Sequence, residues 1–235
     1  MEKPWASFCM STYKRSDFLK NQIEILLKQT FQNYEIVIAD NDPDASGKIV
    51  AESFNDKRIK YECNVEDLGM VKSFNKSIDR ALGEFVVMVT DDDPVFENML
   101  EFFYSVQNKY PNYSLYCGAN RRKTLKDEIE FISKKDFLVQ LLDPKYTNSI
   151  HWSSCLLKRE TLLEIGKLAD FGSGHLVDHI LLSLMGSKDG ALIINKNLSS
   201  TVSHETNYSK TNFNNYVISC TNFYRLLTNH PSLQD

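Results

Sequence analysis

Short apolar segments alternate with amphipathic segments along the first half of the chain, and this alternation limits the possible folds more than any other feature. Apolar and β-branched residues dominate five runs, which we predict to be buried strands: 5–10, 34–40, 59–64, 84–90 and 113–117. Apolar residues return at helical spacing between these runs, which predicts helices at 16–29, 46–55, 69–82 and 97–110. Strands that alternate with helices build a mostly parallel sheet with helices on its faces, so the sequence predicts an α/β fold.

The second half of the chain has a less regular pattern. We predict two strands and two helices there, at 153–157, 191–195, 137–142 and 175–186. The charged segment 121–128 is predicted to be a solvated loop. A chain of 235 residues is long enough for one large domain. We therefore predict a single domain over 1–205, with halves at 1–118 and 119–205, and an amphipathic, aromatic-bearing helical tail at 206–235.

Charge and cysteine content exclude several classes of protein. The net charge of −4 gives no indication of nucleic-acid binding, so no nucleic-acid partner is expected. Five scattered cysteines without a CxxC pair argue against a disulfide framework or a zinc site and fit a reducing compartment. No signal-peptide core is recognised, and no apolar run approaches the roughly 20 residues of a spanning helix. We expect a cytoplasmic protein, with contact to the inner face of the cell membrane left open.

Polar clusters follow three of the predicted strands, at 11–15, 39–44 and 90–93. Ligands of parallel sheets bind beyond the carboxyl ends of the strands, so these clusters are predicted to share one ligand site. Neither a G-x-G-x-x-G turn after the first strand nor a G-x-x-x-x-G-K-[ST] loop is present, which lowers the probability of a dinucleotide or P-loop enzyme.

Three consecutive aspartates, Asp91, Asp92 and Asp93, are the main candidate site. Like charges so close together repel one another unless a cation or hydrogen-bond donors offset them. Mg²⁺ or Mn²⁺ prefers such oxygen ligands and completes its shell with phosphate oxygens and water. The alternative is that Asp92 or Asp93 caps a helix that starts near residue 97.

Two residues near the other strand ends have both a binding and a structural interpretation. Asp40 is placed to accept hydrogen bonds from a ribose or a base edge, although Asx-turns explain the aspartates of 40–44 as well. Tyr13 is placed to stack on a base or simply to pack against the protein.

Four segments in order resemble the family-two glycosyltransferases of GT-A fold. The stretch STYKRSDFLKNQIEILLKQTFQNYEIVIADND is similar to the opening of that family, and NVEDLGMVKSFNKSIDRALGEFVVMVTDDD is similar to the stretch that leads to its D-x-D metal motif, here in a T-D-D or D-D-D form. SSCLLKRETLLEIGKL resembles the acceptor-side strand and helix, and SHETNYS resembles the family's H-x-x-N-x-S ending. The resemblance covers residues 5–209.

This resemblance implies a GT-A nucleotide-binding sheet, a nucleotide-sugar donor and transfer with inversion to an acceptor hydroxyl, with UDP favoured by its frequency in the family. It places donor contacts at Ser11, Thr12, Tyr13, Arg15, Asp40, Lys72 and Asp91. It places Mn²⁺ or Mg²⁺ at Asp92, Asp93 and His204. Arg15 also has the simpler interpretation of a residue that braces its loop.

The resemblance also implies a carboxylate base and an acceptor side. Asp178 matches the base position, although Val177 stands where the family often has a second acidic residue, and Asp170 is the alternative base. Asp178 also has the interpretation of a helix-start charge. His151 and Trp152 are predicted to flank the acceptor strand, where core packing explains Trp152 equally well.

The leading hypothesis is a metal-dependent inverting glycosyltransferase that acts on a glycan or lipid-linked acceptor in bacterial surface polysaccharide or lipopolysaccharide biosynthesis. One alternative is a nucleotidyltransferase, although the first strand lacks the expected glycine-rich loop. The other is a sugar-nucleotide or glycan-binding protein without transfer activity, which the exchange at Val177 favours. The tail helix is expected to pack on the domain, with a membrane contact or a homodimer contact as alternatives.

Overall fold

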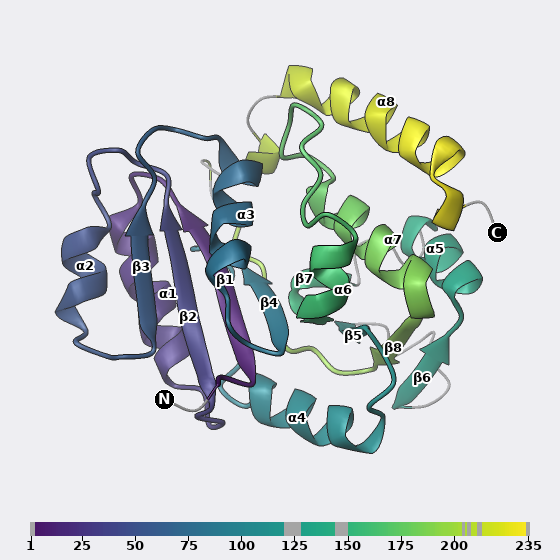
Figure 1. Ribbon diagram of the computed structural model, residues 1–235, viewed down its shortest axis with the longest axis horizontal. Coiled ribbons are helices and arrows are strands. Elements are labelled where there is room, and N and C mark those ends of the chain that lie inside the picture. Colours follow the sequence, from purple (N-terminus) through teal and green to yellow (C-terminus); the bar gives the residue numbers. More distant parts are fainter. Residues whose placement is uncertain are drawn as a thin grey trace.

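A computed structural model describes residues 3–119, 128–143, 150–203, 205, 208–210 and 213–233. In this part of the chain one eight-stranded sheet runs through the molecule in the order β3-β2-β1-β4-β7-β5-β8-β6 (Figure 1). The strands are β1 (Ala6–Thr12), β2 (Tyr34–Asp40), β3 (Ile59–Cys63), β4 (Phe85–Val89), β5 (Leu115–Ala119), β6 (Ile129–Ile132), β7 (Ile150–Lys158) and β8 (Ala191–Ile194). The helices are α1 (Ser16–Leu27), α2 (Lys48–Ser53), α3 (Met70–Arg80), α4 (Met99–Lys109), α5 (Lys134–Leu142), α6 (Arg159–Glu164), α7 (Val177–Asp189) and α8 (Phe213–Asn229).

The predicted α/β fold with a mostly parallel sheet is confirmed. Strands β1 to β4 pair in parallel, and β5 pairs in parallel with β8. Strand β7 lies between β4 and β5 and is antiparallel to both, and β6 is antiparallel to β8. Because β7 runs in the opposite direction, its first residues lie at the same edge of the sheet as the last residues of β4. That edge therefore receives side chains from both halves of the chain.

Helices cover both faces of the sheet, which explains why its central strands are apolar throughout rather than alternating. In β1, Cys9 faces one apolar cluster, which contains Phe74 of α3 and Leu181 of α7. Its neighbour Phe8 faces the other cluster, where α1 and α4 supply Leu19, Ile23, Leu100 and Phe103. All seven residues of β2 are buried. The two clusters hold the strand ends in fixed positions relative to one another.

Several predicted boundaries in the second half are wrong. Strand β6 was not predicted, because its four residues form a short edge strand with only one buried side chain. Strand β7 begins at Ile150, three residues earlier than predicted, so His151 and Trp152 belong to the strand and do not flank it. Helix α7 begins at Val177 and not at 175, because Leu176 has a left-handed backbone conformation that ends the preceding turn. The predicted charged loop at 121–128 lies outside the described residues except for its last residue.

The helix predicted in the tail is α8, which packs against α7 (Figure 1). Phe223 of α8 forms a small apolar cluster with Ile180 and Leu184 of α7. The tail helix thus covers the face of α7 that points away from the sheet. Among the described residues, no helix combines the length and the apolar character needed to cross a membrane.

Candidate active site

The polar clusters that follow β1, β2 and β4 lie together at the carboxyl edge of the sheet, as predicted. Thr12, the last residue of β1, is paired in register with Asp40, the last residue of β2. The run Asp91–Asp93 starts two residues after the end of β4, which pairs with the other side of β1. This edge is where a sheet of this topology binds its ligands.

Arg15 joins the aspartates to the end of the first strand. Its Nη1 donates to Oδ1 of Asp91 and its Nη2 donates to Oδ2 of Asp92, each at 2.8 Å. Thr12 Oγ1 donates to the second oxygen of Asp91 at 3.1 Å. The guanidinium also lies over the ring of Phe18, 4.2 Å from its centroid. Arg15 therefore fixes the aspartates in place, in agreement with the interpretation that it braces the loop.

One arginine does not balance three carboxylates. Burial raises the pKa of Asp91 to about 6, against the opposing effect of the Arg15 charge, and the Asp92 charge raises it further. Burial is also the main cause of a raised pKa at Asp93, and the neighbouring Asp92 charge adds to it. At both positions burial is the main reason that the ionised form is disfavoured. A cation bound beside these carboxylates would favour their ionised form.

The alternative role of these aspartates as helix caps is excluded. Helix α4 begins at Met99 and its N-cap is Asn98, whose side chain makes no cap hydrogen bond; the side-chain acceptor for its first turn is Gln29 Oε1, which binds Leu100 N at 3.1 Å. Asp93 instead accepts a hydrogen bond from the backbone N–H of Val202 at 3.3 Å.

The residues present fit a hard divalent cation as a partial shell. Asp92 and Asp93 offer carboxylate oxygens, the ligand type that Mg²⁺ and Mn²⁺ prefer, and such ions take their remaining ligands from phosphate and water. Within the described residues there is no group of three or more His, Cys, Asp or Glu side chains placed to hold a metal by themselves. His204, the third predicted ligand, lies outside the described residues.

Asp40 is completely buried and organises the loop after β2. Its Oδ1 accepts from Asp42 N at 3.0 Å, and its Oδ2 accepts from Gly47 N at 2.8 Å and from the hydroxyl of Tyr61 at 2.7 Å. These contacts support the Asx-turn interpretation, and contact with a nucleotide stays a prediction. Tyr13 is 42% exposed, so its ring is accessible for stacking at this edge.

A buried polar network joins Ser11, a predicted donor contact, to three residues that sequence reasoning missed: Asn41, Asn64 and Ser73. Ser11 Oγ donates to Ser73 Oγ at 2.7 Å, and Asn64 Nδ2 donates both to Ser73 Oγ and to Asn41 Oδ1 at 3.1 Å. Asn41 and Asn64 directly follow β2 and β3, which is the signal that would have found them. The network joins the ends of β1, β2 and β3 to α3.

Lys72 of α3 faces the acceptor half of the chain. Its Nζ lies 3.9 Å from Oδ2 of Asp170, whose other oxygen accepts from Gly172 N at 3.0 Å. Both oxygens of Asp170 thus have partners, which does not favour its prediction as the alternative base.

Asp178 lies in the first turn of α7 with its side chain 34% exposed. Its Oδ1 accepts from the backbone N–H of His179 at 2.8 Å and lies 3.0 Å from Nδ1 of that ring. Burial opposes ionisation of Asp178, but the His179 side chain and the backbone N–H together lower its pKa. The backbone N–H of Asp178 itself also lowers this pKa, and no other described residue donates a hydrogen bond to Oδ2. An ionised carboxylate with one open oxygen is suited to accept a proton.

Val177, the residue that departs from the family pattern, is 4% exposed and belongs to the core. An acidic side chain at this position would be buried without a partner. The single carboxylate at the start of α7 is therefore a consequence of how the helix packs.

Strand β7 connects the aspartates to Asp178. Besides burial and the Asp92 charge, the charge of His151 influences the pKa of Asp93, in the lowering direction. Cys155 lies four residues after His151 in the same strand. Burial raises the pKa of its thiol, and the charge of Asp178 also acts to raise it. His151 and Cys155 are themselves linked by a hydrogen bond from Sγ to the His151 carbonyl at 3.3 Å.

Trp152 is 8% exposed and packs on Phe74 with 5.1 Å between ring centroids, which supports its role in the core.

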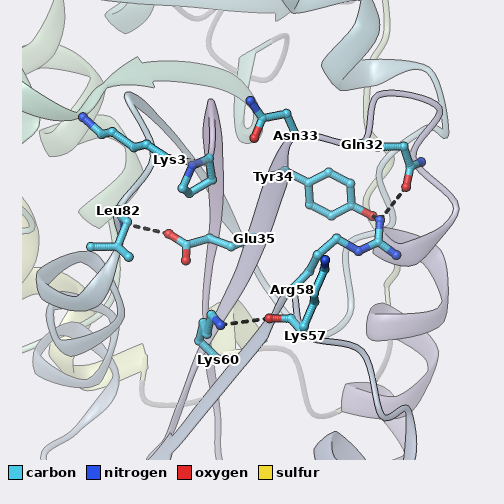
Figure 2. A pocket seen from close by; sticks show the side chains of 10 residues that line it. Lys3, Gln32, Asn33, Tyr34, Glu35, Lys57, Arg58, Lys60 and Leu82 are labelled. Carbon is cyan, nitrogen blue, oxygen red and sulfur yellow. Dashed lines mark hydrogen bonds between the residues drawn. The ribbon is translucent and has the colours of Figure 1, made fainter. Parts of the chain in front are cut away.

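A cavity of about 560 Å³ lies at the opposite, amino edge of the sheet (Figure 2). Glu35 and Arg58, two charged residues that line it, make hydrogen bonds and an ion pair within the protein. Glu35 accepts from Ser7 Oγ at 2.7 Å and from Leu82 N at 2.6 Å, and Arg58 pairs with Asp56. The groups suited to chemistry converge at the carboxyl edge, and we place the candidate site there.

Comparison with known proteins gives a family match. The model of "Glycosyl transferase family 2" matches residues 7–166. Glycosyltransferase GlyG of Streptococcus pneumoniae is 31% identical over 139 residues, which are 58% of this chain and 46% of that protein. The GalNAc(5)-diNAcBac-PP-undecaprenol beta-1,3-glucosyltransferase of Campylobacter jejuni is 29% identical over 58% of this chain and 48% of that protein. The chain spans about half the length of these curated relatives.

Solved structures show the same fold. Residues 1–349 of S. aureus TarS, in complex with UDP-GlcNAc, superpose with a TM-score of 0.72 at 16% identity, over 94% of this chain and 66% of that one. The mannosyltransferase PcManGT of Pyrobaculum calidifontis, in complex with GDP-Man and Mn²⁺, gives 0.65 at 16% identity, over 88% and 59%. At this level of identity the likeness concerns the fold alone.

Proposed function

This chain belongs to glycosyltransferase family 2, and on this premise we propose that it moves a sugar from a nucleotide-diphosphate donor to an acceptor hydroxyl with inversion. The observation that carries the proposal is the placement of two acidic groups at the carboxyl edge of the sheet: the aspartate cluster follows β4, and Asp178 starts α7, the helix that leads back to the first residue of β8. The first group suits a donor diphosphate and its cation, and the second suits an acceptor hydroxyl.

The donor would bind over the ends of β1, β2 and β4. Asp92 and Asp93 would hold Mn²⁺ or Mg²⁺, and Asp91 would contact the ribose or assist in binding the metal. Such an ion, when bound, stabilises the negative charge that develops on the leaving diphosphate. Tyr13 would stack on the base. A uridine nucleotide is the favoured donor; a relative from Escherichia coli is named a UDP-Glc-dependent glucosyltransferase, and TarS has been solved with UDP-GlcNAc.

Asp178 would act as the general base. The acceptor hydroxyl attacks the anomeric carbon, its proton passes to Oδ2 of Asp178, and the bond from that carbon to the diphosphate oxygen breaks, so that the nucleoside diphosphate leaves. Attack from the side opposite the leaving group inverts the anomeric configuration. The lowered pKa of Asp178 keeps this carboxylate ionised at neutral pH. Asp170 is a weaker candidate because both its oxygens have partners.

The acceptor would be a glycan or a lipid-linked saccharide at the inner face of the cell membrane, in bacterial surface polysaccharide or lipopolysaccharide biosynthesis. The names of two relatives support this class, since both describe acceptors on an undecaprenol diphosphate. A binding protein without transfer activity is less well supported, because Val177 is explained by packing and Asp178 keeps an open oxygen.

A thermal-shift series tests the donor site. UDP, GDP, CDP and dTDP are each added with and without Mn²⁺ to wild type, to Asp92→Ala and to Asp17→Ala, a control on the exposed side of α1. We expect metal-dependent stabilisation by UDP that Asp92→Ala loses and Asp17→Ala keeps; about 100 times Kd should add roughly 2.7 kcal/mol. Absence of any nucleotide effect at saturating metal would contradict the proposal. Release of UDP from UDP-sugars in the presence of lipid-linked saccharides then tests transfer.

A further inference from the structure

We propose that the C-terminal segment, Tyr208–Lys210 together with α8 (Phe213–Asn229), is part of the catalytic apparatus because it clamps the turn that positions Asp178. Tyr208 and His175 would be positioning residues, which act on the reaction through Asp178 without touching the substrate. The inference rests on the proposed function of Asp178 as the base.

The clamped turn, Phe171–Leu176, has an unfavourable backbone. Leu176 has a φ of 59°, a left-handed conformation that is rare for a bulky side chain. Its carbonyl nevertheless accepts the hydrogen bond from Ile180 N at 2.9 Å that starts α7. Such a conformation persists only where the surroundings enforce it, and it is found often at functional sites. The start of α7, with Asp178, thus depends on contacts made outside the turn.

Those contacts come from the C-terminal segment. The hydroxyl of Tyr208 accepts a hydrogen bond from the backbone N–H of Gly174 at 3.0 Å. Asn222 of α8 donates to the carbonyl of Phe171 at 3.2 Å. The turn is also tight against both sides, since a Cβ at Gly174 would overlap the side chains of Met70 and Tyr208.

The ring of His175 lies between two tyrosines of the same segment. Its centroid is 4.9 Å from that of Tyr208 and 5.5 Å from that of Tyr216. Nδ1 lies 2.8 Å from Ser173 Oγ, whereas Nε2 is buried without a hydrogen-bond partner among the described residues. Burial of an unpartnered nitrogen is unfavourable, so simple packing would favour a phenylalanine here. The bond from Nδ1 to Ser173, which fixes the turn, is what the histidine adds.

The segment just before the turn is tied to the donor half of the sheet. Asn75 of α3 donates to the carbonyl of Leu168 at 2.9 Å and accepts from its N–H at 3.0 Å. The segment that carries Asp178 is therefore held between α3 and the C-terminal segment. With α3 fixed to the donor site through Ser73, a loosened clamp would move the base relative to the donor. A displacement of about 1 Å at a reacting group can cost 10²-fold in rate.

The test compares Tyr208→Phe with Tyr224→Phe. The first variant removes one hydroxyl and its bond to Gly174; the second removes a hydroxyl from a ring of α8 that is 67% exposed. We expect Tyr208→Phe to lower kcat about tenfold while KM for the donor and Kd for UDP stay at the wild-type values. Amide exchange over residues 172–179 should become faster. Tyr224→Phe should match wild type in all of these measurements.

His175→Phe is the second variant, since it keeps a ring between the tyrosines and removes the bond to Ser173. It should also lower kcat and leave UDP binding unchanged. If the wild type transfers sugar and both Tyr208→Phe and His175→Phe keep its kcat, the proposed clamp is overturned and the proposed function remains intact. If Tm, UDP binding and kcat all fall together, the segment has only a structural role, and the proposed clamp is again overturned. If the wild type itself transfers no sugar, the proposed function fails, and unchanged amide exchange in Tyr208→Phe would then reject the clamp separately.

Discussion

Two halves of this molecule hold their candidate functional groups in different ways: residues 1–118, where the donor is proposed to bind (the donor half), and residues 119–205, which carry the proposed base (the acceptor half). In the donor half, Thr12 at the end of β1 and Arg15 at the start of α1 both donate hydrogen bonds to Asp91, which follows the adjacent strand β4. In the acceptor half, Asp178 follows a turn with a left-handed Leu176, and Gly174 of that turn donates a hydrogen bond to Tyr208 of the C-terminal segment. The proposed donor site thus lies at strand ends that the sheet itself keeps rigid, whereas the proposed base follows a turn that is contacted by residues distant in sequence. Changes in the acceptor half should therefore affect turnover with little effect on donor binding.

The largest expected effect comes from Asp178→Asn. An asparagine keeps the shape of the side chain and an acceptor for the His179 N–H, but it does not accept the proton of the acceptor hydroxyl. A general base contributes typically 10²–10⁴-fold, so kcat should fall by about that factor. Calorimetric titration should show unchanged UDP affinity.

Asp170→Asn is the matched control, since Asp170 is the other carboxylate of this region and pairs with Lys72. It should retain most of the transfer activity. The opposite result, with Asp178→Asn active and Asp170→Asn inactive, would reassign the base.

A smaller effect is expected from His179→Gln, and it should depend on pH. Burial acts to raise the pKa of Asp178, and the His179 side chain, with the backbone N–H, outweighs burial and lowers it. Without the imidazole the pKa of Asp178 rises, so the base is protonated over more of the acidic range. The acid limb of the kcat–pH profile should move to higher pH, with a deficit near pH 5 that largely disappears at pH 8. A deficit of equal size at both pH values would indicate a displaced carboxylate instead.

The sequence predicted the donor half better than the acceptor half for a physical reason. Asp40 and Asp91–Asp93 were located because parallel strands bring their carboxyl ends to one edge, and apolar strands are visible in the sequence. The position of β7 between β4 and β5 depends on pairing between distant segments, which local periodicity does not contain. For the same reason the predicted helix started at 175, whereas the tertiary contacts of His175 place it in a turn before the helix.

The smallest effects, from two buried serines, compare the halves most directly. Ser73 Oγ binds both Ser11 and Asn64 in the donor half, so Ser73→Ala should leave buried polar groups unpaired and lower the free energy of unfolding by about 1–2 kcal/mol. Ser183 on α7 is 1% exposed, and its Oγ has no hydrogen-bond partner in the described residues. Ser183→Ala removes an unsatisfied hydroxyl and should change stability by no more than about 0.5 kcal/mol, or increase it. Urea unfolding with equal m values measures both, and equal losses would contradict the view that the hydrogen bonds of Ser73 stabilise the strand ends of the donor half.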